Sequence, residues 1–108
     1  MQWRVEVLNE TVRAEIEALP ADIRARLARI VDLIETLGLH KVREPHVKPL
    51  GSKLWEMRMK GRDGIARAIY VTAHERRVVI LHAFVKKTRK TPRRAVELAL
   101  ARAKELQQ

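Results

Sequence analysis

The chain has 108 residues, 46% of them hydrophobic, and no cysteine, so we expect a single domain over residues 1–108 with neither disulfides nor a thiolate metal site. A formal net charge of +10 favours a polyanionic partner. Since no apolar run approaches the roughly 18 residues of a membrane span, and the N-terminus lacks the basic head and apolar stretch of a secretory signal, we expect a cytoplasmic protein without a membrane segment.

The first part of the chain predicts one strand and two helices. Residues 3–7 alternate apolar and polar side chains, which is typical of a strand with one buried face. Asn9 is a candidate N-cap for a short helix over 10–19, which Pro20 interrupts. A longer helix follows and ends near Gly38, a suitable C-terminal cap. Its apolar stripe consists of Ile23, Leu27, Ile30, Val31, Ile34 and Leu37.

Residues 39–53 show no clear period and are rich in turn formers, so we expect a loop there. Residues 54–60 then alternate almost without error, which predicts a strand with one apolar and one charged face. The apolar side chains are Trp55, Met57 and Met59, and the charged ones are Glu56, Arg58 and Lys60.

The remaining residues predict two more strands and a final helix. A Gly-rich hairpin turn leads to a strand over 65–72, and a second turn leads to an apolar strand over 78–85. Thr91 and Pro92 are the expected N-cap and first residue of a helix that ends near residue 106.

The predicted order is β-α-α-β-β-β-α, which defines an α+β fold. Strands joined by hairpin-length links pair antiparallel, so we expect a small, mainly antiparallel four-stranded sheet. The two early helices cover one of its faces and a C-terminal helix follows the last strand. The other face stays partly open, and it is the face toward which Glu56, Arg58 and Lys60 point.

Charge is distributed unevenly along the chain. Residues 1–45 carry 7 Lys and Arg against 8 Asp and Glu, whereas residues 46–108 carry 16 against 5. This asymmetry is what a neutral helical scaffold with one polyanion-facing side would produce.

Three segments carry a resemblance to a known family. They are Leu54-Trp55-Glu56-Met57-Arg58, Arg67-Ala68-Ile69-Tyr70, and the stretch from Leu81 to Pro92 with its sequence LHAFVKKTRKTP. In their order and spacing they resemble the RelE/ParE superfamily of toxins, and more closely its phage-derived HigB-like branch. The resemblance covers nearly the whole chain and implies a RelE-like fold.

The resemblance also implies a function. Members of the RelE/HigB type enter the ribosomal A site, where they bind ribosomal RNA and cut messenger RNA. An antitoxin neutralises them. In the HigB branch the antitoxin is usually a helix-turn-helix protein, HigA-like. ParE-like members share the fold but inhibit DNA gyrase without catalysis, and a basic nucleic-acid-binding module without catalysis is a third possibility. Cations on the open sheet face favour the first function.

Metal-independent RNA cleavage uses the substrate's 2′-OH as nucleophile, so the protein must accept a proton, stabilise a phosphorane and donate a proton. Arg67 and Arg58 suit the phosphorane, because the planar guanidinium holds two phosphate oxygens. Lys87 corresponds by resemblance to a catalytic arginine, although Lys86 shares a face with His82 and Phe84. The candidate bases are Glu56 and His82. Glu56 could instead be a structural ion-pair partner, and His82 could instead be a core histidine.

A basic segment follows the last strand, with 6 cations among residues 86–94. We expect it to bind mRNA or rRNA phosphates, because cations in the first turn of a helix are unfavourable for local stability. Phe84 either stacks on a base or packs beneath the site. No histidine spacing predicts a metal site and no cofactor is expected. The expected RNA-binding residues are Arg89, Lys90, Arg93, Arg94, Lys60 and Phe84.

Overall fold

A mixed sheet forms the centre of the computed structural model, which describes residues 2–43, 46–87 and 89–107. Within these residues the sheet has five strands in the order β1-β5-β4-β3-β2. Their bounds are β1 Arg4–Val7, β2 Val47–Gly51, β3 Leu54–Lys60, β4 Ile65–Ala73 and β5 Arg77–Lys86. The strand β1 runs parallel to β5, and all the other neighbours are antiparallel.

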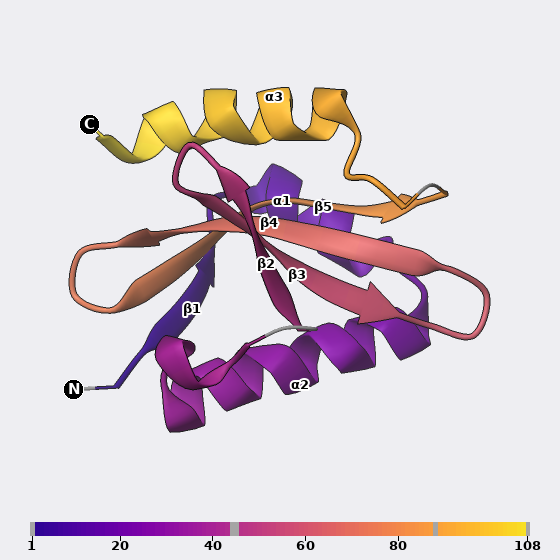
Figure 1. The fold of residues 1–108 in the computed structure, drawn as a ribbon, viewed down its shortest axis with the longest axis horizontal. Coiled ribbons are helices and arrows are strands. Elements are labelled where there is room, and N and C mark those ends of the chain that lie inside the picture. Colours follow the sequence, from indigo (N-terminus) through magenta and orange to yellow (C-terminus); the bar gives the residue numbers. More distant parts are fainter. Residues whose placement is uncertain (1, 44–45, 88, 108) are drawn as a thin grey trace.

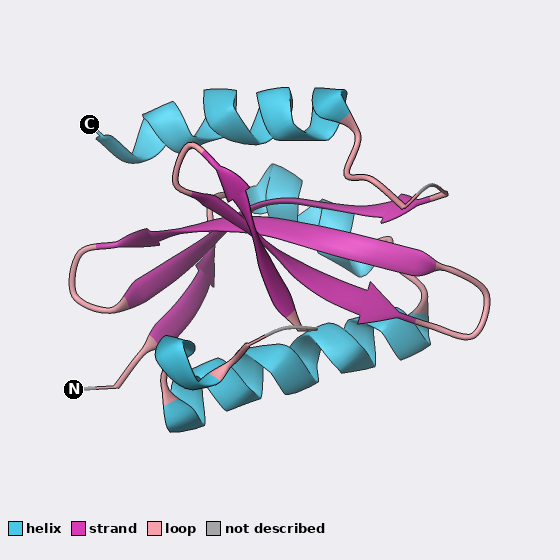
Figure 2. Cartoon of the chain, viewed as in Figure 1, coloured by secondary structure: helices cyan, strands magenta, loops and turns pink. Residues whose placement is uncertain are grey.

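Helices lie on both faces of this sheet (Figures 1 and 2). On one face, α1 (Glu10–Glu17) and α2 (Ala21–Leu37) bury the larger core, and on the other face α3 (Arg93–Ala103) buries a smaller one. Short 3-10 helices follow α2 at Leu39–Lys41 and α3 at Lys104–Gln107. Within the described chain, no helix is both long enough and apolar enough to cross a bilayer.

The predicted start of α1 and the predicted end of α2 are confirmed. The Asn9 side chain accepts a hydrogen bond from the Val12 N–H at 3.0 Å, which satisfies one of the free donors at the start of α1. At the end of α2, Gly38 has a φ of 96°, a conformation that strongly favours glycine. Its N–H donates to the Ile34 carbonyl at 2.8 Å. In contrast to the prediction, Leu37 leaves the apolar stripe and is 54% exposed.

The predicted loop over 39–53 is wrong at its end, because Val47–Gly51 form β2. This strand is additional to the four that were predicted, so the sheet has five strands. Pro49 and Gly51 obscured this strand. Pro49 lacks an N–H, yet β2 is the edge of the sheet and pairs on one side only, where proline is tolerated. The register shifts between Pro49 and Gly51, so the strand is also irregular.

The second sheet face is more covered than predicted. Leu54, Ile69, Val79 and Leu81 are buried there against Ala95 and Ala99 of α3. The start of α3 also differs from the prediction, because Pro92 occupies the N-cap position and no side chain caps the helix. Thr91 instead donates its hydroxyl hydrogen bond to Glu56 on β3.

A bulge in β5 decides which side chains face α3. Tyr70 on β4 pairs with Ile80, whereas its neighbour Ile69 pairs with His82, so Leu81 is an extra residue. Before the bulge, Val78 and Ile80 point toward α2. A strand without it would continue that alternation and place His82, Phe84 and Lys86 on the α2 side. The bulge therefore turns these three side chains toward the α3 face.

Candidate active site

Arg58 and Arg67 meet on the α3 face of the sheet. They are direct partners in the antiparallel register of β3 and β4, on opposite sides of the Gly61–Gly64 turn, and Phe84 of β5 is the next partner of Arg67. Paired residues in neighbouring strands have Cβ atoms roughly 4.5–5.5 Å apart. The hairpin therefore places two guanidinium groups side by side, at the position where the alternation of β3 predicted charged side chains.

Glu56 lies between the two arginines and is only 3% exposed. One carboxylate oxygen is 3.4 Å from Arg67 Nε and 3.8 Å from Arg58 Nε, and the other accepts the hydrogen bond from Thr91. A buried carboxylate held by three groups is poorly placed to take a proton from a substrate hydroxyl. Its position fits an ion-pair partner that aligns the arginines.

Arg67 is 4% exposed, and it has unused hydrogen-bonding capacity. One terminal nitrogen donates to the Ala66 carbonyl at 3.0 Å. Its Nε is close enough to Glu56 for an ion pair but lacks hydrogen-bond geometry, and among the described residues it has no hydrogen-bond partner. Burial lowers the pKa of Arg67, an effect that Glu56 opposes and Arg58 reinforces. The group stays charged, so it is a buried cation beside a single shared carboxylate.

Lys86, and not its neighbour, joins this cluster. Its side chain is 4% exposed and its Nζ donates to the carbonyl of Arg89, which folds the chain after β5 back over the cluster. Burial and the charge of Arg67 lower the pKa of Lys86, although Glu56 acts in the opposite direction. Lys87 is exposed. We call the group Glu56, Arg58, Arg67 and Lys86 the basic cluster.

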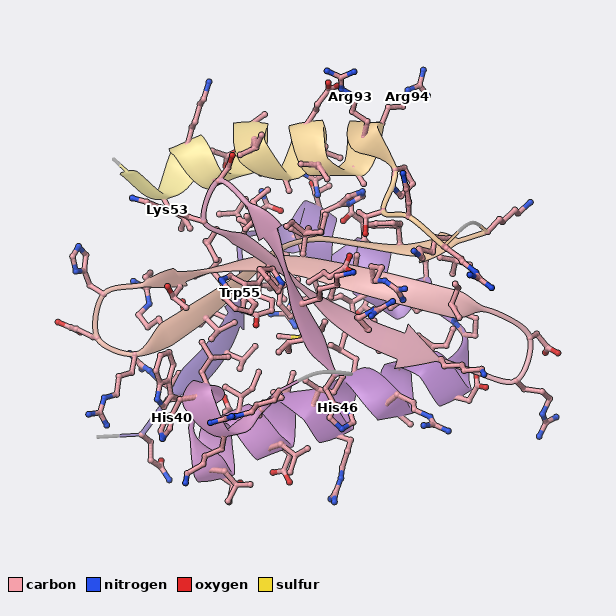
Figure 3. The ribbon with its side chains drawn as sticks, in the orientation of Figure 1. His40, His46, Lys53, Trp55, Arg93 and Arg94 are labelled. Atoms are coloured by element: carbon pink, nitrogen blue, oxygen red, sulfur yellow. The ribbon has the colours of Figure 1, made fainter. Side chains whose placement is uncertain are left out.

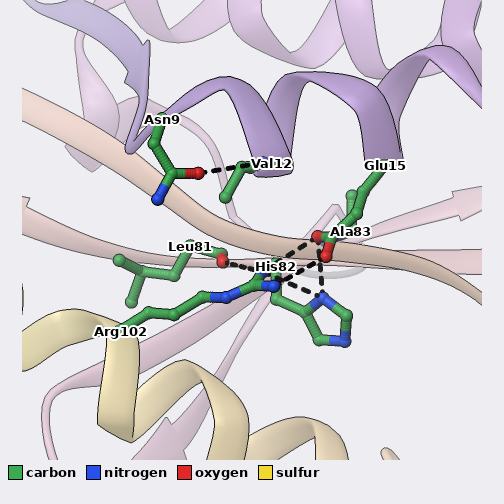
Figure 4. Close-up of polar contacts among 7 residues, drawn as sticks. All are labelled: Asn9, Val12, Glu15, Leu81, His82, Ala83 and Arg102. Atoms are coloured by element: carbon green, nitrogen blue, oxygen red, sulfur yellow. Dashed lines mark hydrogen bonds and ion pairs between the residues drawn. The ribbon is translucent and has the colours of Figure 1, made fainter.

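His82 belongs to a different set of contacts (Figure 4). Its Nδ1 lies 2.8 Å from Glu15 of α1, and the same carboxylate accepts two hydrogen bonds from Arg102 of α3, at 3.0 and 2.9 Å. The imidazole also stacks on Phe84, with ring centroids 4.7 Å apart. Glu15, His82 and Arg102 therefore connect α1, β5 and α3, and we call them the helix-linking triad.

The triad also completes the edge of β5. β1 pairs with β5 only as far as Ile80, so within the described part of the chain no strand lies beside this edge of β5 beyond Ile80. There the Ala83 N–H donates to Glu15 at 3.1 Å and the Leu81 carbonyl accepts from Arg102 at 2.8 Å. Burial alone would raise the pKa of Glu15. Hydrogen bonds from Arg102, His82 and Ala83 nevertheless hold this pKa below its ordinary value.

A positively charged pocket of about 600 Å³ opens beside the basic cluster. It is rimmed by cations from β3, β4, α2 and the segment after β5, over an apolar floor that includes Ile30 and Met59. Among the residues that the structure describes, none with a carboxylate side chain lines this pocket. Its cationic side chains are Arg26, Arg29, Arg58, Lys60, Arg67 and Arg89, with His46 at the rim.

The other predicted RNA-binding residues lie in several places. Lys90 is exposed in the segment after β5. Arg93 and Arg94 project from the side of α3 that faces away from the sheet (Figure 3). Arg93 is paired with Glu97 at 3.4 Å, an exposed interaction that partly offsets its unfavourable position in the first helical turn. These two residues are therefore separate from the basic cluster.

A second pocket, of about 590 Å³, lies at the opposite end of β3 and is mainly apolar. Both tryptophans of the chain line it, Trp3 and Trp55, and Trp55 is 38% exposed. Its other walls include Val47 and the buried Tyr70. Within the described residues no group of three or more His, Asp or Glu side chains is arranged to hold a metal ion.

Three residues of this region have contacts that the sequence did not predict. Glu15 and Arg102 are 67 and 20 residues from His82 in sequence, and nothing in the sequence linked either of them to it. Thr91 was singled out, but as a helix cap. The only available signal for its role was that Pro92 begins the helix without needing a side-chain cap.

Comparisons with known proteins identify a family and a fold for the chain. A family model described as "Phage derived protein Gp49-like" matches residues 14–104. Among solved structures, the chain resembles one in the crystal structure of an archaeal RelE-RelB complex from Pyrococcus horikoshii OT3, with a TM-score of 0.56 and 23% sequence identity. That match covers 79% of this chain and 96% of the other. No curated protein shows significant sequence similarity to the chain.

Proposed function

Because the chain belongs to the phage-derived Gp49-like family and has a RelE-like fold, we propose that it is the toxin of a toxin–antitoxin pair and an endoribonuclease that cuts messenger RNA on the ribosome. The observation that carries this proposal is the basic cluster: two arginines and a buried lysine around one carboxylate, opening into a cationic pocket. Such a site has a surplus of positive charge, which favours an anionic ligand.

The cluster offers the groups that cleavage by the 2′-OH needs. The 2′ oxygen attacks the adjacent phosphorus, a pentacovalent phosphorane forms, and the 5′ oxygen leaves as a hydroxyl with a cyclic phosphate left behind. Arg58 and Arg67 stabilise the extra negative charge of the phosphorane. Lys86 has a lowered pKa, which suits it to donate the proton to the leaving oxygen.

The proton acceptor is assigned to His82 rather than to Glu56. Glu56 is buried and held by three groups. His82 has one nitrogen engaged by Glu15, and a carboxylate at Nδ1 favours the tautomer in which Nε2 can accept a proton. Under this assignment Glu15 acts by orienting the imidazole. The stacked Phe84 fixes the ring plane.

We further propose that a protein antitoxin, HigA-like and of the helix-turn-helix type, neutralises the chain. The archaeal RelE of similar fold forms a complex with RelB, which supports a protein antitoxin as partner. A basic protein with a charge of +10 also favours an acidic partner, because complementary charges accelerate association and suppress wrong pairings.

The deciding experiment adds the purified protein to translating ribosomes and maps the mRNA ends. We expect truncated mRNA with wild type and a rate lower by about 10²-fold or more with Arg67→Ala, the usual effect of removing one donor to a developing anion. Arg62→Ala, in the exposed hairpin turn, is the control and should cut normally. Intact mRNA with accumulation of gyrase-linked DNA breaks would contradict the proposal and favour a ParE-like inhibitor.

The two neighbouring lysines separate the proposed acid from its alternative. Lys86→Met should slow cleavage strongly and remove the alkaline limb of the pH–rate profile, whereas Lys87→Met should leave that limb in place. The opposite result would assign the acid to Lys87, the position that the family resemblance favoured. Folding of both variants is checked by thermal unfolding, because Lys86 is buried and Lys87 is exposed.

A further inference from the structure

The cationic pocket extends well beyond the basic cluster. Val47, the first residue of β2, pairs with Met57, so β3 runs on from Arg58 to Lys60 past the start of β2. The pocket lies along this projecting end of β3 and reaches α2, which contributes Arg26, Arg29 and Ile30. One continuous surface thus connects the α3 face of the sheet with α2, around the edge of β3.

Two of the cations on α2 are not explained by the stability of the helix. Arg26 and Arg29 are three residues apart and therefore neighbours on one side of α2, where like charges are mildly destabilising. Both side chains are exposed, and among the described residues neither has an ion-pair partner. Asp22, one turn before Arg26, is engaged instead by the Arg62 N–H at 2.6 Å.

The dimensions of the pocket indicate more than one phosphate. Pockets of roughly 300–1,000 Å³ hold whole small ligands, and at about 600 Å³ this one has room for more than the single phosphate group at Arg58 and Arg67. The positive charge of the lining side chains favours an anionic ligand. Its apolar floor at Ile30 and Met59 can contact sugar or base surfaces between the charged groups.

We propose that Arg26, Arg29 and His46 form a second phosphate-binding subsite, which holds the RNA strand next to the phosphate at the basic cluster. This inference rests on the proposed function for the identity of the RNA at the cluster, but it adds a separate claim about the path of the strand. The RNA passes around the projecting end of β3 and contacts α2, on the far side of the sheet from α3. The residues of this subsite bind and position the strand and take no part in proton transfer.

The test measures binding of labelled RNA by the full-length protein, without ribosomes, as a function of salt. The variant is Arg26→Ala with Arg29→Ala. The matched control is Arg24→Ala with Arg13→Ala, which removes the same charge from exposed positions outside the pocket. Each phosphate contact on a single strand contributes about 0.7 to the slope of log affinity against log salt. For an eight-nucleotide RNA, we therefore expect the slope to fall by about 0.7 in the variant, for the one phosphate that the subsite holds, and to change little in the control.

A dinucleoside monophosphate, which has one phosphate, locates the effect. The variant should bind this probe as wild type does, because the phosphate at the basic cluster is unaffected. Equal losses in variant and control for the longer RNA would overturn the subsite, as would equal losses for both probes in the variant. A wild type that binds the RNA with the expected slope yet leaves mRNA intact on ribosomes would retain the subsite and contradict the proposed function.

Discussion

Glu56 is the residue around which the basic cluster is organised. A single carboxylate faces Arg58, Arg67 and Lys86, and its second oxygen is used by Thr91. Removing a carboxylate from such a cluster leaves buried cations unpaired, which is more costly than the net contribution of the ion pairs themselves. Glu56 therefore has the contacts of a structural ion-pair partner, and under the proposed function the positive charge that remains binds the RNA phosphate.

Glu15 makes a pH-dependent contribution to stability. Its pKa is lower in the folded chain than the ordinary value of 4.5, so its contacts stabilise the fold above about pH 4.5 and the stabilisation is lost as the pH falls through the folded-state pKa. We expect Glu15→Gln to lower the free energy of unfolding by about 2 kcal/mol at pH 7, the scale of hydrogen bonds to a charged group. Chemical denaturation at pH 7 and at pH 3 measures the difference, which should shrink in acid.

Glu10→Gln is the control for this measurement. Glu10 pairs with Arg13 in the same helix, but its side chain is 91% exposed, and such pairs contribute little. A difference between wild type and Glu15→Gln that stayed constant from pH 7 to pH 3 would contradict an ionised Glu15 in the triad.

Some of these residues could be predicted from the sequence and others could not. The strict alternation of β3 placed Arg58 and Glu56 on one face, and the hairpin turn brought Arg67 beside them. The same local argument grouped Lys86 with His82 and Phe84, whereas the resemblance alone pointed to Lys87. Glu15 and Arg102 were out of reach, because they are 67 and 20 residues away from His82 in sequence and only the packing of two helices brings them to it.

At the scale of elements, small irregularities do most to position the site. The bulge at Leu81 changes the phase of β5, and β3 runs on past the start of β2, which leaves the C-terminal end of β3 projecting. Neither feature has a sequence signal of its own, since Leu81 is one more apolar residue in an apolar strand. The predicted order of elements was confirmed apart from β2, because periodicity specifies helices and strands well but not an irregular edge strand containing proline.

The β3–β4 turn packs closely against α2 at Gly61, so a larger side chain at this position should destabilise the fold. A Cβ at Gly61 would lie 2.6 Å from Cγ1 of Ile23, whereas a Cβ at Gly64 would have only Val85 Cγ1 nearby, at 4.0 Å. We expect Gly61→Ala to lower the free energy of unfolding by about 1–3 kcal/mol, the usual effect of overpacking, and Gly64→Ala to have a much smaller effect. Thermal unfolding of both variants tests this, and equal shifts would show that the turn can move away from α2.

At the scale of the whole molecule, the positive charge is arranged in more than one place. The basic cluster and its pocket lie at one end of β3, the apolar pocket with both tryptophans lies at the other, and Arg93 and Arg94 project from the outer side of α3. Net charge could be predicted from composition alone, but this division could not. It follows from the mixed sheet and from the helices on both of its faces.

A polyanion should therefore stabilise the folded chain. Because the native arrangement of cations is lost on unfolding, RNA or heparin at about 100 times its dissociation constant should add about 2.7 kcal/mol, which corresponds to several degrees in Tm for a domain of this size. Differential scanning fluorimetry measures the shift. It should disappear in about 1 M salt, where exposed charges are screened, and an equal shift with neutral dextran would contradict the electrostatic origin.

The helix-linking triad has one more consequence, which concerns contacts between molecules. An unpaired strand edge is a template on which another chain can add a strand, and this is a common route to aggregation. Beyond Ile80 the edge of β5 would be such a template, but Glu15 and Arg102 occupy the Ala83 N–H and the Leu81 carbonyl. These two side chains thus take the place of a neighbouring strand along the part of the β5 edge that β1 does not reach. They block the addition of a strand from another copy of the chain at this edge.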